Sequence, residues 1–233
     1  MARGRHPTRI HIDPPSEQVS AKYLRYWYGR DLHRASHAFP VLTSRELFSN
    51  DRPLEIDFGC GVGALACGRA RQYPHVNMLG IDLSQKPLFC AVAEAVRCNL
   101  ENIRFIRGNF NVMLPLLLPQ TLSAAYYLFP NPPRDYLRAR ANERRRRFLQ
   151  SVYNALVPGG RFFFATDASE FFRCMHDIAN VELLYETRNI EDADLATRYW
   201  SMWQDHGRKV GSFVIKKNGT MFHQRWLYYD KKK

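Results

Sequence analysis

The sequence predicts an α/β fold with a mostly parallel sheet, and three observations support this prediction. Short strand-like apolar runs alternate with helical patterns from residue 54 onward, as they do in βαβ units. The first run, 54–63 (Leu-Glu-Ile-Asp-Phe-Gly-Cys-Gly-Val-Gly), ends in three alternating glycines immediately before a helical pattern. Near the C-terminus, Asn218-Gly219 separates two further strand-like runs and favours the type I′ turn of an antiparallel hairpin.

Prolines and glycines divide the chain into its expected elements. Pro74 ends the first helix, Pro130 ends the fourth strand, and Pro158-Gly159-Gly160 ends a long basic helix. We expect strands, in chain order, over residues 54–59, 76–82, 103–107, 123–129, 161–166 and 181–187. We expect helices over residues 62–73, 85–99, a short one around 114–118, the basic one up to 156, and 168–179. The C-terminal hairpin is expected to pair 212–217 with 220–229.

Length and composition indicate one main domain. The chain has 233 residues, of which 45% are apolar, and this is enough for a full hydrophobic core. We expect an N-terminal extension or lid over 1–46 and the main domain over 47–233. Within the first segment, residues 1–20 hold three prolines and are expected to be extended or disordered, whereas 21–50 are aromatic-rich and are expected to be partly helical.

Several classes of protein and site are disfavoured by the sequence. No run of 18 or more apolar residues is present, so we expect no membrane span. The first residues lack the apolar centre of a signal peptide. The five cysteines are odd in number and include no C-x-x-C pair, which indicates free thiols in a reducing compartment. We therefore expect a cytoplasmic protein without a disulfide framework or a metal site.

The glycines at the end of the first strand indicate a ligand site. Gly59, Gly61 and Gly63 follow the pattern G-x-G-x-G, and glycine is needed where a backbone turns sharply and approaches a ligand. The helix that follows offers its N-terminus to polar or anionic groups. Asp82 ends the second strand, 23 residues after Gly59, where a carboxylate can accept hydrogen bonds from the ribose hydroxyls of an adenosine-containing cofactor. An ordinary turn would explain the glycines alone.

Together, the glycines and the acid resemble the S-adenosylmethionine (SAM) site of class I methyltransferases. That resemblance implies a Rossmann-like seven-stranded sheet, mostly parallel, which is completed by a C-terminal antiparallel hairpin.

The positive charge is concentrated in two segments. Residues 134–147 carry seven arginines against two acidic residues, and residues 207–233 carry eight lysines and arginines against one aspartate. Such clusters suit a phosphate backbone, although a solvated basic face and a charged tail would give the same composition. We favour a polyanionic partner.

Residues from about 47 to 216 resemble the TrmB-type tRNA (guanine-N7) methyltransferases. Beyond the glycines, the matching landmarks are, in order, Asn50–Ile56, Pro74–Asp82, Phe129-Pro130-Asn131-Pro132, Val157-Pro158-Gly159-Gly160, Ala165-Thr166-Asp167 and Thr197-Arg198-Tyr199. Each landmark is weak alone, but their order and spacing together are fairly specific. The resemblance implies SAM as cofactor and tRNA as partner.

The resemblance and the motifs together imply two sets of site residues. The residues expected to hold SAM are Glu55, Asp57, Gly59, Gly61, Gly63, Asp82, Leu83, Asn109 and Phe110. Asn131 and Asp167 are expected to be the catalytic residues, because they would orient the acceptor. The other residues expected to bind the substrate are Pro132, Arg134, Tyr136, Arg138, Thr197, Arg198, Tyr199 and Trp200.

Several positions depart from the family pattern, and three of them bear directly on the cofactor and acceptor sites. Asn131 stands for the Asp of F-P-D-P-W, Trp200 for the Glu of T-x-F/Y-E, and Asn109 for an acid. An Asn cannot accept a proton, and a general base commonly contributes about 10²–10⁴ in rate. Guanine N7, however, already carries a free lone pair, so position and orientation can carry much of the reaction. The missing Glu matters more, because guanine N1–H and the amino group need an acceptor, a role that Asp167 could fill.

A second interpretation of the acceptor site starts from Asn131-Pro132-Pro133-Arg134. This run resembles the N/D-P-P-Y/F/W motif of SAM-dependent amino methyltransferases, in which the Asn oxygen and a proline carbonyl accept hydrogen bonds from a planar amine. The fourth residue normally stacks on the base; Arg134 stacks less well, and Tyr136 lies two residues further on.

The main expectation is transfer of the SAM methyl group to a purine ring nitrogen, with guanine N7 of tRNA as the acceptor. Two alternatives stay open. One is a relative that methylates a small-molecule nitrogen heterocycle or amine, and the other is a SAM- and RNA-binding protein with weakened catalysis.

Overall fold

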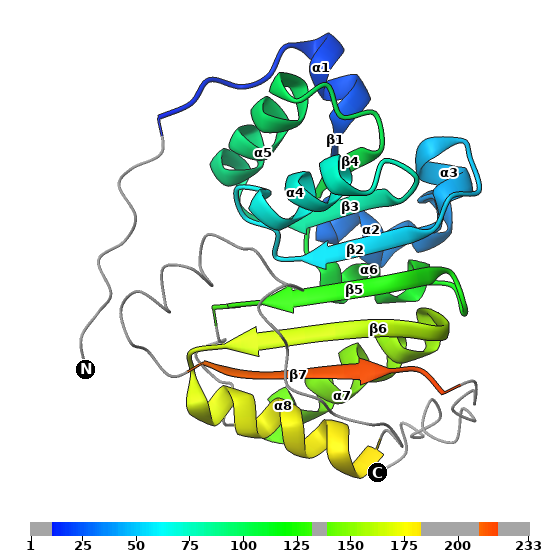
Figure 1. Ribbon diagram of the computed structural model, residues 1–233, viewed down its shortest axis with the longest axis vertical. Helices are drawn as coiled ribbons and strands as arrows, with labels where there is room; N and C mark the ends of the chain where they lie inside the picture. The colour runs from blue at the N-terminus through cyan, green and yellow to red at the C-terminus, as the bar shows by residue number, and fades with distance from the viewer. Residues whose placement is uncertain (1–10, 132–138, 183–209, 219–233) are drawn as a thin grey trace.

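A seven-stranded sheet lies at the centre of the molecule (Figure 1). The structure is a computed structural model that describes residues 11–131, 139–182 and 210–218. In spatial order the strands are β1 (Leu24–Tyr26), β4 (Ile103–Arg107), β3 (Asn77–Asp82), β2 (Leu54–Phe58), β5 (Leu122–Leu128), β6 (Leu156–Thr166) and β7 (Gly211–Lys216). Every neighbouring pair is parallel except β6–β7, which is antiparallel. The α/β class and the mostly parallel sheet are therefore confirmed.

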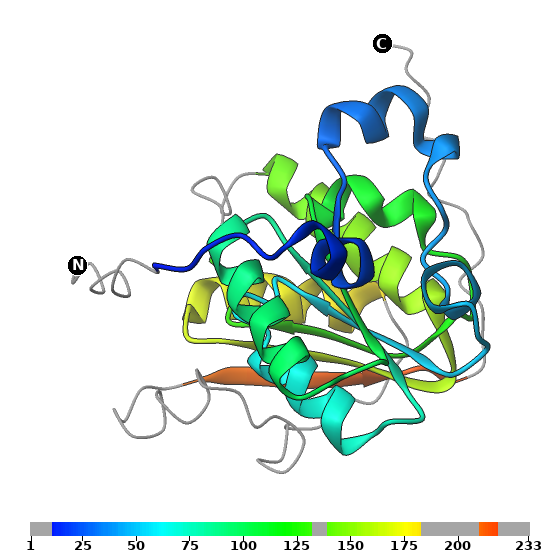
Figure 2. The same ribbon diagram turned by 90° about the horizontal axis from the view of Figure 1, so that it is seen from above.

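Helices cover both faces of this sheet. In chain order they are α1 (Glu17–Tyr23), α2 (Gly29–Ala35), η1 (Ser36–Ala38), α3 (Ser44–Phe48), α4 (Ala64–Gln72), α5 (Gln85–Arg97), α6 (Phe110–Met113), η2 (Leu114–Leu116), α7 (Ala139–Ala155) and α8 (Ser169–Glu182). Figure 2 shows α4 and α5 on one side of the sheet, with α2, α6 and α7 on the other.

Each face of the sheet has its own hydrophobic core. On the α4–α5 face, small side chains such as Ala66 and Ala91 let the helices approach Met78 and Phe105 of the sheet. On the opposite face, apolar side chains of α7 and α8 pack against strands β2 and β6, and the members of that core include Ile56, Phe148, Leu149, Val152, Phe162 and Met175. Because these parallel strands are buried on both faces, β3 and the second half of β6 are nearly continuous apolar runs, whereas β2 also carries the acids Glu55 and Asp57.

The order of the strands reverses beside β2. From β2 the chain moves outward to β3 and β4, and it then returns to the other side of β2 with β5 and β6. In open α/β sheets, ligands bind outside the carboxyl ends of the strands at such a reversal point. The carboxyl ends of β2 and β5, which pair along Leu54–Asp57, flank this point.

The segment before β2 contributes more to the sheet than the sequence indicated. Leu24 pairs with Phe105, so Leu24–Tyr26 forms the edge strand β1, which is too short to leave a recognisable alternation. Trp27 is 6% exposed and belongs to the same core as β2. Helix α1 begins at Glu17, where Ser16 accepts a hydrogen bond from the Val19 amide, and this corrects the expectation for residues 17–20; residues 1–10 lie outside the described part of the chain. The role of residues 1–46 as a lid stays a prediction.

Two expected element boundaries are wrong. Pro158-Gly159-Gly160 was expected to precede a strand at 161, but β6 already begins at Leu156 and these residues form an irregular part of it. Gly159 has a φ of +79°, and its amide donates to the Lys217 carbonyl, so β7 accommodates the irregularity. The expected strand 181–187 starts inside α8, which extends to Glu182; the rest of that strand, like 220–229, lies outside the described residues.

Among the described residues, no helix has both the length and the apolar character that crossing a membrane requires.

Candidate cofactor and acceptor site

The glycine loop joins β2 to α4 at the carboxyl edge of the sheet. Gly59, Gly61 and Gly63 have φ values of +77°, +54° and +75°, which L side chains rarely adopt. A Cβ at Gly59 or Gly61 would meet no atom within 4 Å, so the loop borders open space there. A Cβ at Gly63 would lie 2.6 Å from the Ala91 Cβ, so this glycine is needed for the close contact of α4 with α5. The loop therefore offers a cradle that side chains would fill.

Asp82 ties this loop to the end of β3. Its Oδ2 accepts a hydrogen bond of 2.8 Å from the Gly61 amide, and its Oδ1 accepts one of 2.7 Å from the Ser84 amide. A carboxylate offers about four acceptor positions, so roughly two remain for hydroxyl groups of a ligand. The next side chain, Leu83, is 62% exposed and offers an apolar surface beside the carboxylate. Both residues fit the edge of an adenosine site.

Asp57 is the fourth residue of β2, two positions before Gly59, and is 4% exposed. Among the residues that the structure describes, none donates a hydrogen bond to its carboxylate. Burial, and to a lesser extent the charge of Asp82, raises the pKa of Asp57 to about 7. The same surroundings raise the pKa of the Cys60 thiol well above its usual range. A buried carboxylate without a protein donor suits a cationic ligand.

Glu55, two residues earlier on the same face of β2, has a different environment. Its carboxylate accepts hydrogen bonds of 2.5 and 2.8 Å from Arg69 of α4 and one of 3.0 Å from the Tyr126 hydroxyl of β5. Glu55 is 6% exposed, and the Arg69 guanidinium also lies 5.1 Å from the Tyr126 ring centroid. These hydrogen bonds connect α4 to β2 and β5, and each carboxylate oxygen of Glu55 accepts at least one of them. Neither Arg69 nor Tyr126 was singled out from the sequence, because their partners are distant along the chain.

Asn109 and Phe110 begin α6 at the end of β4. The Asn109 Oδ1 accepts a hydrogen bond of 3.0 Å from the Asn111 amide, so the side chain caps the short helix. The Phe110 ring packs against Phe58 and Phe148, with ring centroids 5.3 and 5.4 Å away. Both residues lie at the same edge of the sheet as Asp82, since β3 and β4 are parallel neighbours.

Asn131 and Asp167 are brought to this edge by β5 and β6. The two strands run parallel, with Leu128 opposite Ala165, so the residues that follow them emerge side by side. Both Asn131 and Asp167 are exposed. Between them, the Phe129 amide donates a 2.7 Å hydrogen bond to the Ala165 carbonyl, and Phe129 has a φ of +48°. That conformation is strained for a bulky residue, and such strain is common at ligand sites.

The remaining residues expected to bind the substrate lie outside the described part of the chain. They are Pro132, Arg134, Tyr136, Arg138, Thr197, Arg198, Tyr199 and Trp200.

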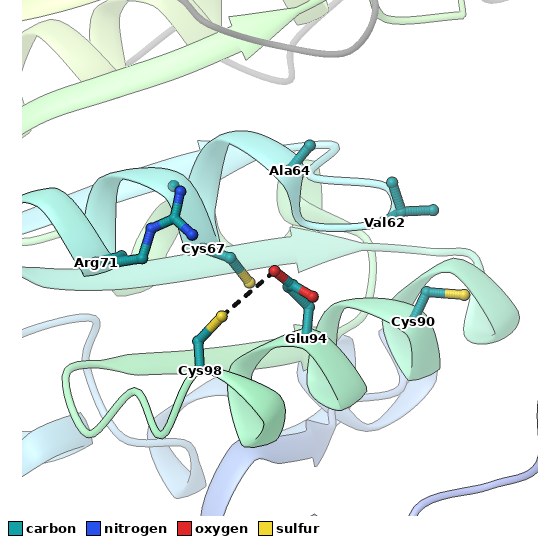
Figure 3. A pocket seen from close by; sticks show the side chains of 8 residues that line it. Val62, Ala64, Cys67, Arg71, Cys90, Glu94 and Cys98 are labelled. Carbon is teal, nitrogen blue, oxygen red and sulfur yellow. Dashed lines mark hydrogen bonds between the residues drawn. The ribbon is translucent and has the colours of Figure 1, made fainter.

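A cavity of about 390 Å³ lies apart from these strand ends, between α4 and α5 (Figure 3). Figure 3 shows the thiols of Cys67 and Cys98 turned toward Glu94, with Cys90 pointing away. Burial and the charge of Glu94 raise the pKa of Cys67 to about 12, so this thiol stays protonated and is a poor nucleophile. Within the described ranges, no group of three or more His, Cys, Asp or Glu side chains is placed to hold a metal ion.

Two cations of the basic segments are buried. Arg145 is 7% exposed and lies 6.0 Å from the Phe171 ring centroid, whereas Arg144 and Arg147 beside it are exposed. The helical period could have shown this, because position 145 lies one turn from the buried Ala141 and Phe148. The other buried cation is Lys217, whose burial no pattern in the sequence indicated. The charge pattern alone did not separate these two buried residues from the exposed cations of the same segments.

Comparison with known proteins places the chain in a family. The family model described as "Putative methyltransferase" matches residues 51–218. A tRNA (guanine-N(7)-)-methyltransferase of Rubrobacter xylanophilus is 37% identical over 216 residues, which cover 89% of this chain and 96% of the relative. A protein of the same name from Chloroherpeton thalassium is 33% identical over 224 residues, which cover 92% of this chain and 98% of the relative.

Solved structures support the fold assignment. A Streptococcus mutans methyltransferase in complex with S-adenosylhomocysteine (SAH) aligns with a TM-score of 0.52 and 10% identity, and the match covers 71% of this chain and 89% of that one. At this identity the likeness concerns the fold alone. The relatives carry the assignment further: this chain belongs to the TrmB-type tRNA (guanine-N7) methyltransferase family, and it is a SAM-dependent methyltransferase.

Proposed function

We propose that this methyltransferase transfers the SAM methyl group to N7 of a guanine in tRNA. The relatives described above are named for that activity, and the match spans nearly their full length. The net charge of +12 suits a polyanionic acceptor. One observation carries the proposal: the parallel pairing of β5 with β6 brings Asn131 and Asp167 to the edge of the sheet that also holds the glycine loop.

Four groups of the chain would hold the cofactor. The open space beside Gly59 and Gly61 admits a ligand close to the backbone. Asp82 would accept hydrogen bonds from the ribose hydroxyls, with Leu83 against the adenine. Asp57 would pair with the ammonium group of the methionine part, because it is the buried carboxylate that lacks a protein donor. Asn109 and Phe110 would border the adenine. Glu55 is assigned to the contact with Arg69 and not to the cofactor.

When it is bound, SAM supplies an electrophilic methyl group. The chain's own task is to present guanine N7 in line with that group. N7 carries a free lone pair, so no side chain has to remove a proton before the attack. The Asn131 amide can donate and accept hydrogen bonds and would orient the base, which explains why an Asn serves there. Asp167 would accept hydrogen bonds from guanine N1–H and the amino group.

Further contacts with the acceptor are assigned by the family resemblance. We propose that Arg134, Tyr136, Arg138 and Pro132 line the acceptor site, and that Thr197, Arg198, Tyr199 and Trp200 close over the base.

Methyl transfer can be tested with labelled SAM and two acceptor pools, unmodified tRNA and a small-molecule extract. Nucleoside mass spectrometry should find 7-methylguanosine in the tRNA. Asn131→Ala should lower kcat by at least about 10²-fold while SAM affinity stays within twofold, because the residue acts on the acceptor. Normal turnover by Asn131→Ala would contradict its assignment, and labelled tRNA without 7-methylguanosine would contradict the choice of atom.

A second candidate function follows from the Asn at position 131. An Asn followed by two prolines suits a planar amine, as in amino methyltransferases. The acceptor would then be a small nitrogen heterocycle or amine. Label only in the small-molecule pool of the same assay would favour this function over the first.

We also propose a cytoplasmic location. All five cysteines are free thiols in the structure, which suits a reducing compartment in which tRNA is available.

A further inference from the structure

Three carboxylates lie near the ends of β2 and β3, and among the residues that the structure describes only one of them has no hydrogen-bond donor. Glu55 is held by Arg69 and Tyr126, and Asp82 accepts two backbone hydrogen bonds. Asp57 is 4% exposed, yet no donor among the described residues reaches its carboxylate. A buried ionised carboxylate without a donor is costly, so the group gains a proton unless a cation arrives.

In the described part of the chain, the groups packed around Asp57 offer it no cation. Asp82 of β3 is an anion, and its charge disfavours ionisation of Asp57. Cys60 of the glycine loop and Cys67 of α4 are thiols whose pKa values are raised, so both stay neutral. On β5, Tyr126 stands opposite Asp57 in the strand register, but its hydroxyl donates to Glu55.

The two arginines of α4 nearest the glycine loop in sequence, Arg69 and Arg71, lie beside other acids. Arg69 of α4 binds both carboxylate oxygens of Glu55, at 2.5 and 2.8 Å. Arg71, on the same helix, lines the cavity between α4 and α5 with Glu94. Asp57 is therefore surrounded by one anion and by neutral groups. Consistent with this geometry, its pKa is raised to about 7.

We propose that cofactor binding in this enzyme is coupled to the release of a proton from Asp57. In the free protein, Asp57 is partly the neutral acid. When the ammonium group of the methionine part of SAM enters, the carboxyl O–H bond breaks and the proton leaves to solvent. The resulting carboxylate then pairs with the ammonium group. The inference rests on the cofactor arrangement of the proposed function. It adds that occupancy by SAM depends on pH in the neutral range.

The direction of the coupling follows from linkage. The free protein binds more protons than the complex, so SAM affinity rises with pH until Asp57 is ionised in the free protein. With a pKa of about 7 in the free site, the apparent Kd should fall about fivefold between pH 6 and pH 7. The ammonium group of the ligand stays protonated throughout this interval, since α-amino groups titrate near 8.

Isothermal titration calorimetry of the full chain with SAM tests the proposal without any turnover. SAM is titrated at pH 7 in phosphate and in Tris, two buffers that differ in ionisation enthalpy. The difference between the two observed binding enthalpies should correspond to the release of about half a proton per SAM bound. Asp57→Asn should bind SAM more weakly with heats that no longer depend on the buffer. Glu55→Gln is the matched control: it changes a buried acid two residues away on the same face and should retain the buffer dependence.

Two further outcomes decide the source of the coupling. SAH carries the same ammonium group as SAM but no sulfonium, so the binding of SAH should release as many protons from the protein as the binding of SAM does. Proton release on binding of SAM but not of SAH would overturn the pairing of Asp57 with the ammonium group. Heats for SAM that are independent of buffer would overturn the proton coupling and leave the proposed function intact, whereas a failure of SAM to bind at all would overturn the cofactor arrangement itself. Circular dichroism of Asp57→Asn and Glu55→Gln separates these outcomes from loss of folding.

Discussion

Gly61 and Gly63 differ in what their missing side chains permit. Both have positive φ, so an alanine at either position costs about 1–2 kcal/mol in backbone strain. A Cβ at position 61 would enter open space, whereas one at position 63 would lie 2.6 Å from the Cβ and 3.2 Å from the Cα of Ala91. We therefore expect Gly61 to leave room for a ligand, whereas Gly63 allows the close packing of α4 against α5.

Gly61→Ala and Gly63→Ala should consequently fail in different ways. Gly61→Ala should keep most of the free energy of unfolding but lower SAM affinity, because its methyl group occupies the cradle. Gly63→Ala should lose about 3 kcal/mol or more of that free energy, because the backbone of α5 must move. Urea denaturation and SAM titration of the two variants check this, and equal stabilities would contradict the packing role of Gly63.

At the residue scale, the two acids of β2 also differ in their hydrogen-bond partners. Glu55 and Asp57 project from the same face, but Asp57 lies nearer the glycines and, among the described residues, has no hydrogen-bond donor at its carboxylate. Sequence similarity places both in the cofactor site. The contacts of Arg69 and Tyr126 make Glu55 part of the scaffold.

At the scale of elements, the buried contact of Glu55 with Arg69 and Tyr126 connects α4 to β2 and β5. Helix α4 follows the glycine loop directly, so its position sets where that loop lies. A buried ion pair is weak evidence for stability, but removing one member leaves a buried charge uncompensated.

Glu55→Gln should therefore lower the free energy of unfolding by about 3 kcal/mol, because Arg69 would lose its charged partner. SAM affinity near pH 7 should change by less than about threefold. Chemical denaturation and calorimetry measure the two quantities on the same sample. A loss of SAM binding as large as that of Asp57→Asn, with unchanged stability, would show that Glu55 contacts the cofactor after all.

Lys217 connects two other elements. It follows β7, is 1% exposed, and its Nζ donates to the carbonyls of Asn154 and Leu156, at 2.9 and 2.7 Å. Asn154 lies in the last turn of α7 and Leu156 follows that helix as the first residue of β6, so the lysine stands at the end of α7, where a cation is favoured by the helix dipole. Burial lowers the pKa of Lys217. The lysine thus caps a helix instead of meeting a polyanion.

Lys217→Met should cost about 1–3 kcal/mol of unfolding free energy, because the Leu156 and Asn154 carbonyls lose the lysine as a donor, although Asn154 keeps the Gln120 amide. The neighbouring exposed Lys216 supplies the control: Lys216→Met should change stability by less than about 0.5 kcal/mol. Thermal or urea unfolding of the pair measures the difference, and equal effects would contradict the capping role.

At the scale of the whole molecule, charge and strand order act together. The chain carries a net charge of +12, and the residues expected to orient the base emerge where β5 and β6 end. A phosphate backbone bound by a basic protein displaces its counterions, so the binding constant falls steeply with salt.

The Kd for tRNA should therefore rise at least about tenfold between 50 and 200 mM salt, while the Kd for SAM should change by less than about twofold. Filter binding or fluorescence anisotropy at four salt concentrations gives the slope. A tRNA affinity independent of salt would argue against a polyanionic acceptor held by the basic residues and in favour of a small-molecule pocket.

The sequence predicted most of the regular elements because their cause is local. Strand β2, the glycines and α4 follow from an apolar run, a G-x-G-x-G pattern and a helical period within twenty residues. Strand β1 was missed, since three residues show no alternation and are held by pairing with β4, about eighty positions away. The start of β6 was misplaced because Pro158-Gly159-Gly160 normally ends an element, whereas here the backbone of Lys217 pairs with it.

The sequence by itself determined the α/β class, the glycine cradle and Asp82, because the spacing of neighbouring residues sets them. Only the tertiary structure decided which of two nearby acids is free for a ligand and which cations are buried. Those assignments depend on Arg69, Tyr126 and the end of α7, groups that come from other elements. Whether a charge finds a partner is set by the packing of distant segments, and the order of residues along one strand does not contain that information.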